Sequence, residues 1–229
     1  MKLLGIESSC ERVSVAVLCD GQIHQQWVEG GNTPSARLIP TALELLAAHG
    51  LTMGALDAIA LGVGPGAFTG LRLGCSVAQG FALAADLGIV PVGSLAAIAA
   101  AQSAPRVLVA SDARMGEAYV AAFVRGADGY VALSAPVCLP PESVVLPPEG
   151  VWLGVGTAFG SYAGRLLAGE ARLTLGDATA VPAAGELVHL AAASLAHTPA
   201  CDPATVGPTY VRDKVAQTVA ERLAQGGKA

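Results

Sequence analysis

Apolar and polar residues alternate in short runs at the start of the chain. Residues 3–6 and 13–18 are rich in Leu, Ile and Val and are separated by the polar triplet Glu7-Ser8-Ser9, and the segment 19–21, Cys-Asp-Gly, leads into a third run at 22–28. Short β-branched and aliphatic runs bounded by turn residues are typical of strands, and an Asp-Gly pair favours a tight hairpin. The pattern predicts three strands, the last two joined as a hairpin.

A helical period follows. We expect a helix over residues 35–49, with Thr33 as its cap, Pro34 in its first turn and Gly50 as its stop. Pro40 either kinks this helix or marks its true start. The chain then predicts a strand at 58–63, a glycine-rich turn, a helix at about 69–86, a strand at 89–92 and a helix from Ser94. Strands that alternate with helices favour a sheet with a parallel part.

The opening pattern recurs about 104 residues later. Residues 106–110 and 119–124 are apolar and flank the polar segment 111–114, and a further strand is expected at 130–137. A strand at 151–155 and helices at 157–169 and 182–197 complete the second copy. We therefore predict an α/β fold of two similar halves, residues 1–103 and 104–229, with a cleft between them. The last helix is a candidate to pack back on the first half.

Composition narrows the possible functions. Thirteen basic and eighteen acidic residues give a net charge of −5, without any basic cluster, so tight nucleic-acid binding by this chain alone is not expected. Apolar residues make up 53% of the chain, but its longest uncharged stretch, 87–105, is broken by Pro and Gly, so no membrane span is expected. The five cysteines form no CxxC pair, and the apolar run before Glu7 is shorter than a secretory signal. We expect a cytoplasmic protein with reduced thiols.

The two polar turns are the first candidate site. Turn amides and hydroxyls from duplicated halves would face each other across the cleft and bind phosphate. The side chains concerned are Glu7, Ser8, Ser9, Asp112 and Arg114. The alternative is that they are ordinary turn residues beside hairpins.

The glycine-rich segment 62–70 lies between a predicted strand and a predicted helix, where free amides attract anions. No lysine follows it, and Pro65 removes an amide, so neither a phosphate loop with lysine nor a dinucleotide fingerprint is present. In the following helix, small residues form a stripe that either receives a second helix or packs on the chain's own sheet. This stripe consists of Gly70, Gly74, Ala78, Ala82 and Ala85.

Catalytic signatures are missing from the sequence. The four histidines, His24, His49, His189 and His197, form no HxxxH or HExxH pair and have no cysteine at ligand spacing, so no metal site is expected. No GxSxG or kinase-type loop occurs. Asp112 is the one candidate general base that a free-standing enzyme could use.

Several segments together resemble one bacterial family, called TsaB or YeaZ. They are Gly5-Ile6-Glu7-Ser8-Ser9, Ala36-Arg37-Leu38-Ile39-Pro40, Gly64-Pro65-Gly66-Ala67-Phe68-Thr69-Gly70-Leu71-Arg72-Leu73-Gly74, Asp112-Ala113-Arg114-Met115-Gly116-Glu117 and Pro208-Thr209-Tyr210-Val211-Arg212. They occur in the family's order and spacing and span nearly the whole chain. The family's opening acid is commonly Asp, and here it is Glu7.

The resemblance implies a duplicated actin-like, sugar-kinase-like fold related to ribonuclease H. It also implies a scaffold and dimerisation subunit, without catalysis of its own, for N6-threonylcarbamoylation of the adenosine next to the anticodon of tRNAs that read codons beginning with A. The implied partners are the paralogue TsaD and the ATPase TsaE. ATP and a metal would belong to these partners, and tRNA would be met only in the complex. A homodimer of the isolated chain is left open. The alternative that the resemblance leaves is an enzyme of the same superfamily, either an ATP-using small-molecule kinase or a metallopeptidase-like enzyme.

The resemblance further implies that the helices at 35–49 and 69–86 contact TsaD. On that basis the predicted interface consists of Leu38, Leu45, Gly70, Arg72, Gly74, Ala78 and Ala82. The polar turns would then be a vestigial phosphate cleft.

Overall fold

The computed structural model describes residues 1–29, 34–127 and 129–212. A five-stranded mixed sheet forms the first half, with the order β3-β2-β1-β4-β5. The central strand β1 is antiparallel to β2 and parallel to β4, and the Asp20-Gly21 hairpin joins β2 to β3. The strands are β1 (Leu3–Glu7), β2 (Ser14–Cys19), β3 (Gln22–Trp27), β4 (Ala58–Gly62) and β5 (Gly88–Val92).

The second half repeats this plan in the order β11-β10-β6-β7-β8, with β9 paired to β7. Its central strand β6 is antiparallel to β7 and parallel to β10, as β1 is to β2 and β4. The strands are β6 (Arg106–Asp112), β7 (Ala118–Gly126), β8 (Gly129–Ala132), β9 (Val137–Leu139), β10 (Trp152–Val155) and β11 (Leu173–Leu175). The predicted duplicated α/β fold is therefore confirmed.

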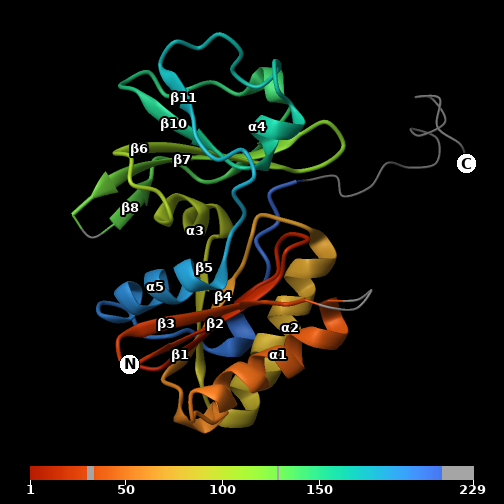
Figure 1. Cartoon of the computed structure of the whole chain (residues 1–229), viewed down its shortest axis with the longest axis vertical. Coiled ribbons are helices and arrows are strands. Elements are labelled where there is room, and N and C mark those ends of the chain that lie inside the picture. Colours follow the sequence, from red (N-terminus) through yellow and green to blue (C-terminus); the bar gives the residue numbers. More distant parts are fainter. Residues whose placement is uncertain (30–33, 128, 213–229) are drawn as a thin grey trace, which may run out of the picture.

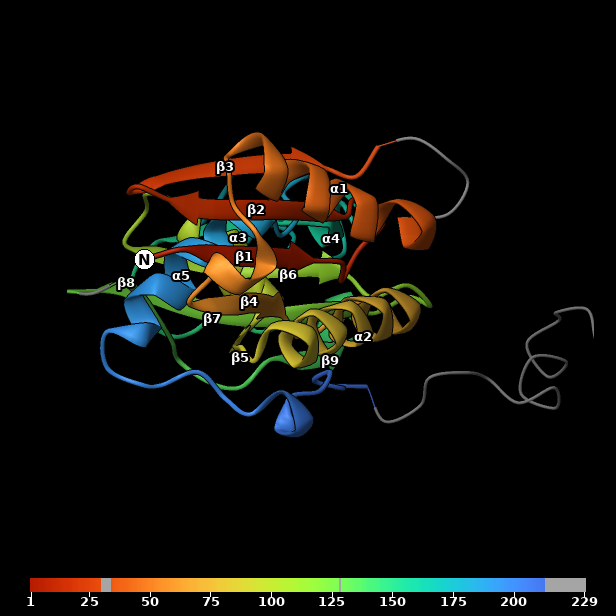
Figure 2. The same cartoon turned by 90° about the horizontal axis from the view of Figure 1, so that it is seen from below.

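Two long helices, α1 (Pro34–Ala48) and α2 (Phe68–Ala85), lie side by side on one face of the first sheet (Figure 2). Pro40 lies inside α1, so the alternative in which the helix starts there is wrong. The predicted Thr33 cap falls outside the described residues. Leucines of α1 and small residues of α2 share one core with β1, β2 and β4, because both helices turn their apolar faces to the sheet.

The remaining helices cross between the halves. The helix α3 (Ser94–Ala100) follows the first sheet but packs on β6, β7 and β8, whereas α5 (Ala184–Leu195) follows the second sheet but packs on β1 to β5. Figure 1 shows both helices between the two sheets. The short helix α4 (Thr157–Ser161) lies on the outer face of the second sheet, together with loop residues around Leu146 and Leu166. Each half thus completes the core of the other.

Two predicted elements in the second half are shorter than expected. The helix expected at 157–169 ends at Ser161, because Gly164, Leu167 and Gly169 adopt positive φ values that a right-handed helix excludes. The strand expected at 130–137 is interrupted after Ala132 and resumes as β9, with Pro136 between the two parts. Within the described ranges, no helix combines the length and apolar character that crossing a bilayer requires.

Candidate functional site in the cleft between the halves

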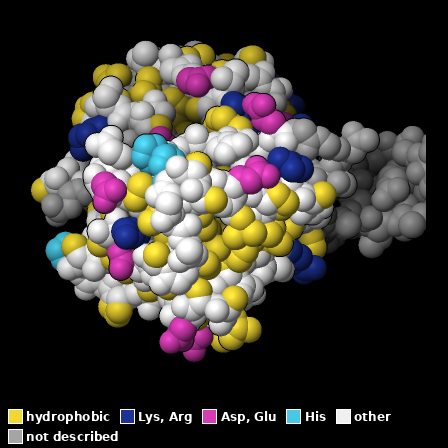
Figure 3. Space-filling model, turned by 60° about the horizontal axis from the view of Figure 1, so that its bottom comes forward, with side chains coloured by type: hydrophobic (Ala, Val, Ile, Leu, Met, Phe, Trp, Pro, Cys, Tyr) yellow, Lys and Arg dark blue, Asp and Glu magenta, His cyan; other side chains and the backbone are white. Residues whose placement is uncertain are grey.

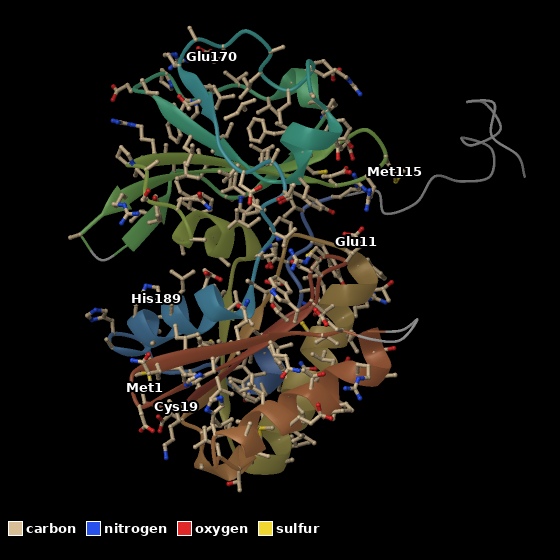
Figure 4. The ribbon with its side chains drawn as sticks, viewed as in Figure 1. Met1, Glu11, Cys19, Met115, Glu170 and His189 are labelled. Atoms are coloured by element: carbon tan, nitrogen blue, oxygen red, sulfur yellow. The ribbon has the colours of Figure 1, made fainter. Side chains whose placement is uncertain are left out.

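A cleft of about 500 Å³ lies where the two polar turns meet. Ser9, Cys10 and Glu11 line it from the first half, and residues 111–115 line it from the second. Residues 209–212 of the C-terminal segment complete its wall. Figure 4 shows Glu11 and Met115 on opposite sides of the gap, each projecting from the turn that follows the central strand of its half. The structure therefore brings the two predicted turns together.

The first turn is sealed into the protein and not offered to a ligand. Glu7, Ser8 and Ser9 are all buried. The Ser9 amide donates to Glu7 Oε1 at 2.6 Å, and Ser94 Oγ donates to Glu7 Oε2 at 2.9 Å. Ser8 Oγ donates to the Gly70 carbonyl at 2.8 Å, which ties the turn to the first turn of α2. Complete burial raises the pKa of Glu7, while the hydrogen bonds from Ser9 and Ser94 partly oppose that rise.

The second turn points its acid into the cleft, but that acid is already saturated with donors. Asp112 Oδ1 accepts from Tyr162 Oη at 2.7 Å and from the Arg114 amide at 2.8 Å. Asp112 Oδ2 accepts from Ser161 Oγ at 3.0 Å and from Arg114 at 3.3 Å. The sequence pointed to Asp112 and Arg114, but Ser161 and Tyr162 were missed because they follow the turn by about 50 residues without a local motif.

These donors decide what Asp112 can do. Burial would raise its pKa, but the bonds from Tyr162, the Arg114 amide and Ser161, with the charge of Arg114, lower it below the ordinary value. A carboxylate with a lowered pKa and four bonds has little tendency to take a proton from a substrate. Burial and the bond to Asp112 raise the pKa of Tyr162 to about 12, and burial raises that of the Cys10 thiol to about 11. Neither group is an activated nucleophile or base at neutral pH.

The cations of the cleft are also engaged. Arg114 forms an ion pair with Glu11 across the cleft. Arg212 pairs with Glu117 at 2.6 Å and donates to the Arg114 carbonyl at 3.0 Å. The sequence marks Arg212 only as part of a family-like segment, because its distance in sequence from residues 114–117 hides the contact. The structure places the C-terminal segment as a strap that joins the two halves.

The amides of the glycine-rich loop are only partly available to an anion. The Gly64 amide donates to Ser94 Oγ at 3.2 Å, the Ala67 amide donates to the Ser9 carbonyl at 2.6 Å, and Pro65 has no amide hydrogen. These bonds fasten the start of α2 to the first polar turn, so two of the loop's amides are already occupied within the protein.

The stripe of small residues on α2 packs on the chain's own sheet and turn. Gly74, Ala78 and Ala82 are buried, and a Cβ at Gly74 would overlap Ser8 Oγ, while one at Gly70 would overlap the Ser8 carbonyl. Leu38 and Leu45 of α1 are buried in the same core. These six predicted interface residues therefore do not form an outward surface, and that prediction is wrong for them. The error arose because the helical periodicity of the sequence shows which residues share one face of a helix but not what packs against that face.

Arg72, the seventh predicted interface residue, is exposed. It donates to Tyr210 Oη at 3.0 Å and lies over the Phe68 ring, with 3.7 Å from its guanidinium carbon to the ring centroid. Phe68 in turn stacks on Tyr210, with ring centroids 5.3 Å apart. This cluster fixes the C-terminal strap to the start of α2.

The outward faces of α1 and α2 carry a different apolar set, which we call the outer helical face. It consists of Ile39 and Leu43 from α1 and Leu83 from α2, with exposed fractions of 42%, 46% and 85%. Figure 3, seen from the side of these helices, shows hydrophobic side chains gathered into a patch with charged groups mainly around it. Such a patch marks an interaction surface more often than a catalytic one.

A second group of chemically active side chains lies outside the cleft. Cys19, His24 and His49 bring their donor atoms within 4.8 Å of one another. Sequence spacing did not reveal them, because five and twenty-five residues separate them and they come from three different elements. Figure 4 shows Cys19 at the end of the first sheet far from Glu11 and the cleft.

Comparisons with known proteins agree with this architecture. Residues 32–150 match the family model described as TsaD, tRNA N6-adenosine threonylcarbamoyltransferase. The chain is 32% identical over 225 residues to the Escherichia coli tRNA threonylcarbamoyladenosine biosynthesis protein TsaB, covering 94% of this chain and 96% of that protein. The TsaB protein of Haemophilus influenzae is also 32% identical, over 228 residues, which cover 94% of this chain and 95% of that protein.

Two solved structures indicate the same family. YeaZ from Pseudomonas aeruginosa superposes with a TM-score of 0.82 at 34% sequence identity, covering 91% of this chain and 99% of that chain. A second Pseudomonas aeruginosa crystal structure, described as similar to peptidase YeaZ, superposes with a TM-score of 0.84 at 34% identity, covering 92% and 99%. Identity at this level over nearly the whole length of both partners is decisive: the chain belongs to the TsaB (YeaZ) family.

Proposed function

We propose that this chain is a noncatalytic subunit in the cytoplasmic biosynthesis of threonylcarbamoyladenosine in tRNA. It acts by pairing with a TsaD-type threonylcarbamoyltransferase and, through that pair, with the ATPase TsaE. Two relatives that match over nearly their full length carry the name of this pathway. The observation that supports a scaffold role is the contrast between the cleft, whose acids and cations are mutually paired, and the outer helical face, whose leucines are exposed.

The occupant of the outer helical face is proposed to be the transferase. Residues 32–150, which include both outer helices, match the family model of that enzyme. A paralogue of the same fold would present a similar pair of helices, so that two apolar helical faces would bury each other. With a net charge of −5, the chain would reach tRNA only through the more basic surface of its partner.

Reconstitution tests the proposal directly. Purified chain, TsaD and TsaE from one organism would be combined with threonylcarbamoyl-adenylate, ATP and tRNA, and modified adenosine would be measured by mass spectrometry of the digested tRNA. We expect product only when this chain and TsaD are both present. Turnover by this chain alone, or full turnover without it, would overturn the scaffold role.

A matched pair of variants tests the surface. Leu83→Glu places a charge at the most exposed leucine of α2, and Glu and Leu have similar helix propensity, so the fold should persist. Val145→Glu is the control, because Val145 is 82% exposed in the second half. Binding of TsaD should weaken about 30-fold or more for Leu83→Glu, the effect of an anchor worth about 2 kcal/mol, and should not change for Val145→Glu. Equal binding by both variants would contradict the proposed surface.

A further inference from the structure

We propose that Cys19, His24 and His49 form a zinc-binding site that fastens the β2–β3 hairpin to the end of α1. The site is separate from the cleft and from the outer helical face, and it does not depend on the proposed function. Its three donors are one sulfur and two imidazole nitrogens, all within 4.8 Å of one another. Zinc binds thiolate and imidazole in this mixture, whereas calcium and magnesium require oxygen ligands.

The hairpin fixes two of the three ligands. Asp20 and Gly21 have positive φ values of 50° and 73°, which a two-residue hairpin turn requires. In the resulting register Val17 pairs with His24, and Cys19 pairs with Gln22. Because side chains alternate along a strand, Cys19 lies on the same face as Val17 and therefore on the same face as His24. The turn thus sets a sulfur and an imidazole diagonally across one face of the sheet.

The end of α1 brings the third ligand to that face. The helix ends at Ala48, and the Gly50 amide donates to the Ala47 carbonyl at 3.0 Å while the Leu51 amide donates to Leu46 at 2.9 Å. This pair of bonds, with φ of 65° at Gly50, is the Schellman arrangement that fixes the chain at a helix end. It holds His49 over β2, where α1 covers the sheet.

The three groups are arranged as metal ligands rather than as hydrogen-bonding residues. The rings of His24 and His49 are stacked, with centroids 3.8 Å apart and planes 25° apart, so the two imidazoles lie directly against each other. Within the described part of the chain, neither ring nor the Cys19 sulfur has a hydrogen-bond partner in the protein. Three groups with metal-binding atoms therefore lie close together without a side-chain hydrogen bond joining them.

Distances and burial fit zinc after a small closure. Tetrahedral coordination with Zn–N of about 2.0–2.1 Å and Zn–S of about 2.3 Å places donors about 3.3–3.6 Å apart. The three donors here are at most about 1.5 Å farther apart than that. Cys19 is buried, whereas both imidazoles are half-buried, so the rings can turn toward the sulfur while water occupies the fourth position. Binding converts the Cys19 thiol to thiolate and releases its proton to solvent.

Cobalt(II) provides the spectroscopic test, because it replaces zinc and reports its ligands. We expect the full chain to bind one Co²⁺ with the visible bands of a tetrahedral site and a near-ultraviolet sulfur-to-cobalt band, and one equivalent of Zn²⁺ to abolish both. Cys19→Ser should lose the sulfur band. His24→Gln and His49→Gln should weaken Zn²⁺ binding by at least roughly 100-fold, because even changes behind a ligand cost about 10- to 100-fold.

Matched controls keep the test specific. Cys138→Ser removes another half-buried thiol, and His197→Gln removes an exposed imidazole outside the group, so both should bind Zn²⁺ like the unchanged chain. The two histidine variants affect half-buried positions and should fold, as circular dichroism would verify. Absence of a sulfur-to-cobalt band in the unchanged chain, its persistence in Cys19→Ser, or unchanged Zn²⁺ affinity in both histidine variants would overturn the proposal.

Discussion

The two halves share a strand plan but differ in what covers the outer face of each sheet. In the first half two helices of 15 and 18 residues cover it, whereas in the second half only the five-residue α4 and loops do so. The first half buries the inner sides of its helices and exposes Leu83 on the outside. The second half fills its outer core with large side chains, Trp152 and Phe159 among them. The two sheets are alike, whereas the outer layer is a pair of long helices with exposed apolar residues on one half and a compact cover of one short helix and loops on the other.

The two polar turns also differ in what covers them. Glu7 and Asp112 occupy corresponding ends of β1 and β6, yet Glu7 is sealed beneath α2 while Asp112 faces the cleft. The long helix requires glycine at positions 70 and 74 to approach the first turn. In the second half α4 is short, and Ser161 at its end and Tyr162 just beyond it donate hydrogen bonds to the acid instead.

Removing the largest side chain of the second half should have the greatest effect. Trp152 is 1% exposed, and its indole nitrogen donates to the Glu149 carbonyl at 2.9 Å. Trp152→Ala should lower the free energy of unfolding by about 3–5 kcal/mol, and Ile59→Val in the first half by about 0.5–1.5 kcal/mol. Urea titration followed by circular dichroism measures both. Because α3 and α5 link the halves, each variant should unfold in one transition, and two separated transitions would contradict that coupling.

Two glycines of α2 separate its inner side from its outer side. Gly74→Leu should cost about 1–3 kcal/mol, because the new side chain meets Ser8 and Leu61. Gly80→Ala should stabilise the chain by up to about 1 kcal/mol, because Gly80 is exposed and nothing lies within 4 Å of a Cβ there. Thermal melts of both variants test the assignment. Equal melting temperatures for Gly74→Leu and the unchanged chain would indicate that the stripe of small residues lies on the surface.

The buried acid of the first turn should make stability depend on pH. The pKa of Glu7 is raised by burial, so between the unfolded value near 4.5 and the folded value the native chain holds the extra proton. The free energy of unfolding contributed by Glu7 therefore falls as pH rises through that window. The Gln side chain of Glu7→Gln cannot ionise. The melting temperature of this variant should therefore rise relative to that of the unchanged chain as pH rises from 4.5. A constant difference across the window would show that Glu7 ionises normally.

The ion pair across the cleft should contribute least. Arg114 and Glu11 have side chains that are 68% and 74% exposed, so water screens their attraction. Glu11→Gln should change the free energy of unfolding by less than about 1 kcal/mol, and 1 M salt should reduce even that difference. Chemical denaturation at low and high salt checks this. A larger, salt-independent loss would mean that the pair holds the cleft closed.

Sequence reasoning anticipated the sheets because their apolar runs are short, buried and repeated. It also brought the two polar turns to one cleft, since corresponding strand ends in a duplicated fold meet, but it did not show that Glu7 is buried behind Ser9 while Asp112 faces the cleft. It failed for the stripe on α2 and for the helix expected at 157–169. The first failure came from tertiary packing, which decides whether a face of small residues meets solvent or the Ser8 backbone. The second came from left-handed positions at Gly164 and Leu167, which apolar content does not reveal.

Contacts between residues that are far apart in the sequence could not be predicted from the sequence. Arg212 meets Glu117, and His49 meets His24, through chain reversals that no local spacing encodes. Only the family resemblance pointed to the segment that contains Arg212.

The crossing of α3 and α5 has a consequence for synthesis on the ribosome. The first sheet ends at Val92, but the helix that covers its inner face begins only at Ala184. At a translation rate of about 5–20 residues per second, roughly 5–20 s separate the two. During that interval Leu3, Ala16 and Ala60 lack the cover that α5 gives them in the finished protein. The nascent chain thus carries an open apolar surface that only its own late-emerging helix or a chaperone can cover.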